Sequence, residues 1–124
     1  MKTAAVYEPM QSMERLVMEL RTLVKHESAE ALELRDRLAE TRRTHPRDAS
    51  LDGRWSSTED LLLSAEESLH EANAALAAVR GASEAETERA YRGARAELER
   101  AFFEYRQAHR ELSVLVAIYL RTAR

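Results

Sequence analysis

The stretch EAETERAYRGARAELERAFFEYRQAHRELSVLVAIYLRT, residues 84–122, decides the fold of this chain. Its large side chains recur every seven positions, at Tyr91, Leu98, Tyr105, Leu112 and Tyr119. Three residues after each of the first four stands an alanine or, in the last case, a leucine: Ala94, Ala101, Ala108 and Leu115. A period of 3.5 residues places one apolar stripe along a helix that packs against other helices. We therefore predict a long helix over about 84–122.

A second helix is predicted over about 57–80. Its apolar stripe contains Leu62, Ala65, Leu69, Ala72, Leu76 and Val79. Ser56, with Glu59 three residues later, fits a capping box, in which each side chain accepts a hydrogen bond from the other residue's backbone N–H. Pro46 and Gly53 are typical helix breakers, so we expect a linker over 43–55.

The connection between these two helices is predicted to be a tight antiparallel hairpin. Gly81 can adopt the left-handed conformation that ends a helix. Ser83 and Glu86 form another capping box directly afterwards. Alanines opposite large residues in both stripes allow the two helix axes to approach closely.

A first helix is predicted over about 9–42, where Pro9 is tolerated in the first turn. Its stripe contains Met10, Met13, Val17, Leu20, Val24, Ala31, Leu34 and Leu38, with Glu27 as an exception. Leu16 and Leu23 widen this stripe on one side. The chain is therefore predicted to be a single all-α domain, residues 1–124, folded as a bundle of three long helices with coiled-coil-like packing.

Composition excludes several classes of function. The chain has 124 residues, a formal net charge of −3 at pH 7 and no cysteine. A mildly acidic charge argues against a dedicated nucleic-acid binder, and the absence of cysteine excludes disulfides and thiolate metal sites. The first ten residues lack the apolar core of a signal peptide, and LSVLVAIYL is too short to span a bilayer. We expect a cytoplasmic protein that does not insert into membranes.

No motif in the sequence predicts catalysis. Glu67 and His70 have the Glu-x-x-His spacing of carboxylate-bridged metal sites, but both fall on the polar face of their helix. We expect no catalytic residue, no metal site and no cofactor, and therefore no enzyme. A small all-helical enzyme is the third hypothesis, after a protein–protein interaction module and a nucleic-acid-associated regulator.

The last apolar stretch, LSVLVAIYL at 112–120, has no polar face, and Phe103 falls on the outer side of its helix. Such surfaces are typical of helix-in-groove recognition. We therefore predict a protein–protein interaction module, such as an adaptor, a scaffold or a chaperone-like protein. The expected partner- or dimer-binding residues are Phe102, Phe103, Leu112, Leu115, Val116, Ile118, Tyr119, Leu120, Met10, Met13, Val17 and Leu20.

Two arrangements would cover the apolar tail. In one, the first helix runs antiparallel to the third within the chain. In the other, the first helix of one subunit covers the tail of its mate in a homodimer, which we expect, with a helix of another protein as the alternative partner. The competing function is a nucleic-acid-associated regulator that uses an arginine-rich linker. Its basic residues are Arg35, Arg37, Arg42, Arg43, Arg47 and Arg54, interleaved with Asp36, Glu40, Asp48 and Asp52.

Overall fold

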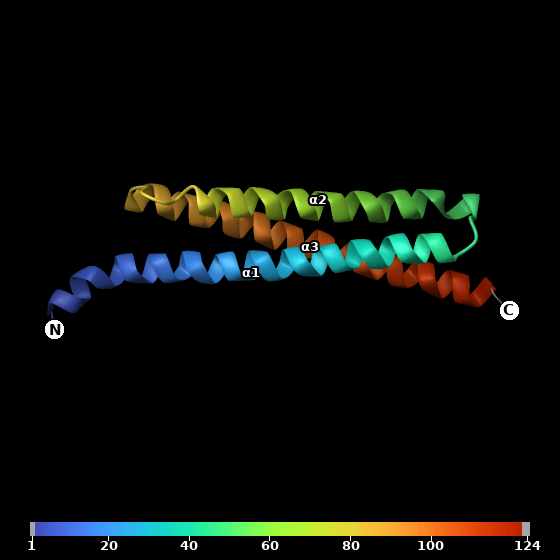
Figure 1. Ribbon diagram of the computed structural model, residues 1–124, viewed down its shortest axis with the longest axis horizontal. Coiled ribbons are helices and arrows are strands. Elements are labelled where there is room, and N and C mark those ends of the chain that lie inside the picture. The colour runs from blue at the N-terminus through green and yellow to red at the C-terminus, as the bar shows by residue number, and fades with distance from the viewer. Residues whose placement is uncertain (1, 123–124) are drawn as a thin grey trace.

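The computed structural model describes the backbone of residues 2–122 and the side chains of residues 12–122. Three long helices follow one another, α1 (Lys2–Thr44), α2 (Asp52–Ala77) and α3 (Glu84–Thr122). A short 3-10 helix, η1 (Ala49–Leu51), lies in the linker between α1 and α2. The helices pack against one another as an all-α bundle, which confirms the predicted fold class (Figure 1).

The bundle has a simple up-down-up order. α1 and α3 run in the same direction, and α2 runs in the opposite direction (Figure 1). Met13 and Val17 of α1 therefore lie near the α2–α3 turn, whereas the end of α3 lies near the linker. The arrangement in which α1 runs antiparallel to α3 within the chain is excluded, so the first half of α1 cannot cover the tail of its own α3.

The closest packing in the bundle is between α2 and α3. The alanines of the two stripes are no more than 1% exposed: Ala65, Ala72, Ala94, Ala101 and Ala108. Leu69 and Leu76 of α2 are also buried there. Small residues below large ones let the helix axes approach, as the sequence predicts.

The turn between α2 and α3 is also close to the prediction. Gly81 has a φ of 77°, the left-handed conformation that residues with a Cβ rarely adopt. The Ser83 hydroxyl accepts a hydrogen bond from the Glu86 backbone N–H at 3.2 Å, which caps α3. The residue C-terminal to α2 is Ala78, so that helix ends slightly before the predicted residue 80.

The predicted start of the second helix is wrong. α2 begins at Asp52, inside the expected linker, and Ser56 lies within it rather than at its cap. The cap that forms is at η1, where the Asp48 carboxylate accepts from the Ser50 backbone N–H at 3.0 Å. α1 also extends further than predicted, from Lys2 to Thr44.

Candidate interaction surface

The apolar tail of α3, residues 112–120, is covered in part within the chain. Leu112 and Leu115 are core residues, and Tyr119 is only 9% exposed. Val116 and Ile118 are half-buried against the same core. The expectation of an uncovered tail that needs a partner is therefore wrong for Leu112, Leu115 and Tyr119, whereas Val114 and Leu120 stay exposed. The reason lies in the linker and the start of α2, which cover it.

A cluster of the aromatic side chains Trp55, Tyr119 and His45 joins the end of α3 to the linker and the start of α2. The Trp55 indole N–H donates a hydrogen bond to the Tyr119 hydroxyl at 3.1 Å, and both side chains are buried. The His45 ring centroid lies 4.5 Å from that of Tyr119, and the His45 Nδ1 lies 2.7 Å from the Thr41 carbonyl oxygen. The Arg42 guanidinium lies over the Trp55 ring at 5.8 Å. Residues from all three helices and the linker are thus joined at this end.

The sequence contained a signal for this cluster. Leu51, Trp55 and Thr58 are all buried, and with Leu62 they follow the i, i+4, i+7, i+11 spacing of one helix face. The stripe of the second helix therefore continues backwards through the expected linker. Gly53 is exposed and has open space around it, so a helix passes through it at a modest cost in stability.

The expected partner-binding residues fall into three groups. The exposed group contains Phe102, Phe103 and Leu120, of which Phe103 is 63% and Leu120 64% exposed to solvent. Half-buried are Met13, Val116 and Ile118. Buried in the core of the chain are Val17, Leu20, Leu112, Leu115 and Tyr119. Met10 lies outside the residues whose side chains are described. The buried group offers no surface to a partner, since its own helices already cover it.

Apolar side chains remain exposed along the side of the bundle where α1 and α3 meet, which we call the α1–α3 groove. Leu16 and Leu23 are 37% and 50% exposed, and Phe102 is 39% exposed. Leu16, Leu23 and Glu30 are spaced by seven residues and so follow one line along α1. On α3 the same spacing links Glu88, Arg95 and Phe102. Near the turn, Met13, Tyr91 and Arg92 line a hollow between the two helices.

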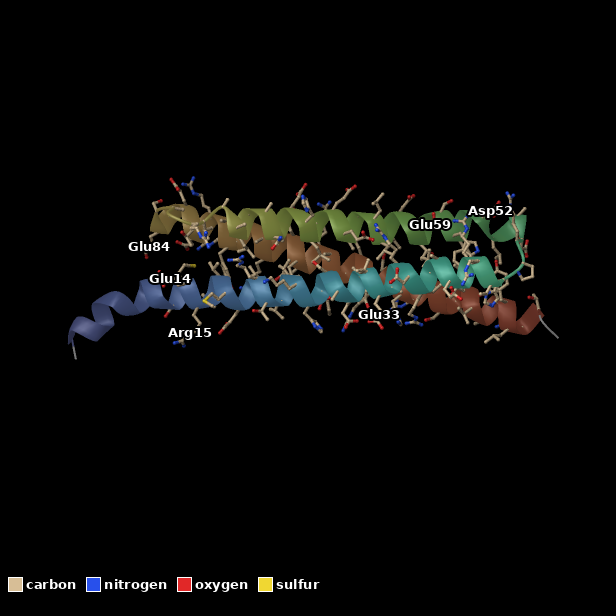
Figure 2. The ribbon with its side chains drawn as sticks, in the orientation of Figure 1. Glu14, Arg15, Glu33, Asp52, Glu59 and Glu84 are labelled. Atoms are coloured by element: carbon tan, nitrogen blue, oxygen red, sulfur yellow. The ribbon has the colours of Figure 1, made fainter. Side chains whose placement is uncertain are left out.

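Tyr105 of α3 indicates that Glu30, the third residue of the α1 line, lies on the flank of α1 that faces α3. Burial raises the pKa of the Tyr105 hydroxyl, and the negative charges of Glu30 and Glu27 raise it further. A smaller contribution comes from Glu33. These carboxylates therefore lie on the flank of α1 that faces α3, and Glu33 points away from α2 (Figure 2).

Charged ridges border the groove on both sides. On α1 the ridge contains Glu19, His26 and Glu33, each three residues after a member of the Leu16 line. On α3 it contains Arg92, Glu99 and Arg106, each four residues after a member of the Phe102 line. The Arg106 guanidinium stacks over the Phe102 ring at 4.4 Å. Residues three or four apart are neighbours on a helix, so each ridge lies directly beside the line of its own helix that follows the groove.

The opposite side of α1, where it meets α2, is bridged by ion pairs. Arg35 pairs with Glu66, and Arg42 pairs with Glu59 on the side of α2 that faces α1 (Figure 2). Within the arginine-rich cluster, Arg43 also pairs with Glu40, Arg47 with Asp52 at 3.3 Å and Arg54 with Glu111 at 3.7 Å. Neighbouring carboxylates therefore neutralise most of the basic cluster, which weakens its potential as a phosphate-binding footprint.

Glu67 and His70 are both exposed on α2, where the sequence placed them. Within the described residues, no group of three or more histidine, aspartate or glutamate side chains could hold a metal ion. Over the same residues, no helix has an apolar window long enough to cross a membrane. Comparisons of the chain with known protein families, with curated proteins and with solved structures found no match.

Proposed function

We propose that this protein is a non-enzymatic interaction module whose binding surface is the α1–α3 groove together with Phe103. One observation carries the proposal. The bundle fills its own core, yet Leu23, Phe102 and Phe103 stay exposed on α1 and α3. Phe103 lies next to Phe102 on α3, on the outer side of the helix.

The physical reason is the cost of exposing these side chains to water. Burying a leucine or phenylalanine side chain fully is favourable by roughly 1.5–3 kcal/mol. Single exposed apolar residues are common, but large ones that gather along one groove mark sites of protein interaction. Aromatic residues beside arginine, as at Phe102 and Arg106, are also typical of interface hot spots.

The nucleic-acid alternative receives less support. Arg35, Arg42 and Arg54 each have a carboxylate partner from another helix. Binding a phosphate backbone through them would require breaking these pairs, and the chain as a whole is acidic. Among the side chains that the structure describes, no convergent set of polar groups favours an enzyme.

Site-specific photo-crosslinking in cells tests the proposal. A photoreactive phenylalanine analogue is placed at Phe103, and the same analogue at Leu63 of α2 serves as the matched control, because Leu63 is 51% exposed. We expect a discrete crosslinked product, with this chain or another protein, from position 103 and none from position 63. No product from position 103, or equal products from both positions, would contradict the proposed surface.

A further inference from the structure

We propose that the partner in the α1–α3 groove is a second copy of this chain, packed in parallel so that α1 of each copy lies on α3 of the other. This inference rests on the proposed function and names its partner. The arrangement has a two-fold axis along the bundle, which exchanges α1 and α3 across the interface. It differs from the dimer expected from the sequence, because the tail of α3 takes no part in it.

The register between α1 and α3 is defined by contacts within the chain. The His45 ring lies against the Tyr119 ring at the linker end, and the charge of Glu30 raises the pKa of Tyr105 in the middle of the bundle. Each contact defines an offset in residue number between facing residues of α1 and α3, and two parallel helices keep this offset along their length. It brings the α1 ridge level with the α3 ridge: Glu19 with Arg92, His26 with Glu99, and Glu33 with Arg106.

Charge complementarity then selects the second copy. A two-fold axis along the bundle leaves every residue at its own level, so Glu19 meets Arg92 of the partner subunit and Glu33 meets Arg106 of the partner subunit. His26 meets Glu99 of the partner subunit in between. Each contact occurs twice because the interface is self-complementary.

An antiparallel copy is disfavoured by the same residues. Centred on His26 and Glu99, it would place Arg92 against Arg106 of the partner subunit, and Glu19 against Glu33 of the partner subunit. Like charges across an interface oppose association. In the parallel copy Leu23 is level with Ala96 of the partner subunit, six residues before Phe102 of the partner subunit, so each copy lies over the groove of the other.

The existing ion pair of Arg92 on the α3 ridge is compatible with this arrangement. Arg92 pairs with Glu88 along α3 at 2.7 Å, and its side chain is still 75% exposed. A guanidinium has five N–H donors, so Arg92 can hold Glu88 and a second carboxylate together. The Glu33 and Arg106 side chains are likewise exposed.

The test uses the full chain and two charge reversals, Glu33→Arg and Arg106→Glu. Each single variant puts like charges at both copies of the contact, so we expect its dimer dissociation constant, measured by sedimentation equilibrium, to rise about tenfold or more. Mixing the two single variants creates a heterodimer with opposite charges at both contacts. We expect the mixture to dimerise as tightly as the parent protein.

Only a contact between chains gives this rescue, since a contact within one chain cannot be repaired by a second variant. Glu67→Arg on α2 is the matched control and should leave dimerisation unchanged. A parent protein that stays monomeric up to high micromolar concentration, or a mixture that associates no better than its components, would overturn the inference. In that case a product from position 103 with a different protein would still support the proposed function, whereas the absence of any product would remove both.

Discussion

At the linker end of the bundle, the tail of α3, the start of α2 and the linker bury their large side chains against one another, whereas along the first half of α1 Leu16, Met18 and Leu23 remain exposed. Both regions are rich in apolar residues in the sequence. They differ in the number of elements that surround them. Three helices and the linker converge on Tyr119, while α1 meets the hairpin with only the central part of a wide apolar face.

This difference separates apolar residues that stabilise the fold from those available for recognition. A stripe at two positions per heptad is enough to hold a helix in a bundle. α1 carries apolar residues outside these positions, on both flanks of its stripe. Apolar side chains within the stripe stabilise the fold, whereas those on its flanks contribute little to stability until a partner covers them. Substitutions at the two ends should therefore have effects of very different size.

The largest effect is expected from Trp55→Ala at the linker end. The substitution removes a large buried side chain that covers the tail of α3, and it leaves a cavity beside Tyr119. We expect the free energy of unfolding, measured by urea denaturation, to fall by about 3–5 kcal/mol. A variant that unfolds at the same urea concentration as the parent would mean that the linker does not cover the tail.

A smaller effect at the same end is expected from Tyr119→Phe. This substitution keeps the ring but removes the acceptor of the Trp55 N–H, which is buried and would lose its hydrogen bond. We expect a loss of about 1–3 kcal/mol in the free energy of unfolding. Tyr91→Phe, at a half-buried tyrosine near the α2–α3 turn, is the matched control, with an expected change below about 0.5 kcal/mol. Equal changes in the two variants would contradict the buried hydrogen bond.

The sequence was sufficient for the hairpin because each signal there is local and they agree. Gly81 and Ser83 define the turn, and the alanines at Ala94 and Ala101 define the face that α2 contacts. At the start of α2 the signals disagreed. Pro46, Gly53 and the Ser56–Glu59 pair indicated a linker followed by a cap, whereas burial of Trp55 favoured a helix. Tertiary packing of the tryptophan outweighed the local helix breakers, and the helical spacing of Leu51, Trp55 and Leu62 was the sequence signal for it.

The candidate surface was predictable only in part for a related reason. Phe103 falls on the outer side of α3 for any neighbour, so its exposure follows from the helical period alone. Whether Leu112 and Tyr119 are exposed depends on what the linker does, and whether Leu23 meets α2, α3 or water depends on the direction of α1. That direction is decided by the linker, whose contacts join residues far apart in the chain.

The smallest effect on folding is expected from Leu23→Gln, in the exposed half of α1. Leu23 lies outside the central stripe, and its side chain is already half in contact with water, so the free energy of unfolding of the monomer should change by about 0.5 kcal/mol or less. Its neighbour Val24 is only 1% exposed, and Val24→Ala should cost about 2 kcal/mol. Denaturation of both variants at low protein concentration checks this. If Leu23→Gln destabilises the monomer as much as Val24→Ala, Leu23 belongs to the core of its own chain rather than to a surface for a partner.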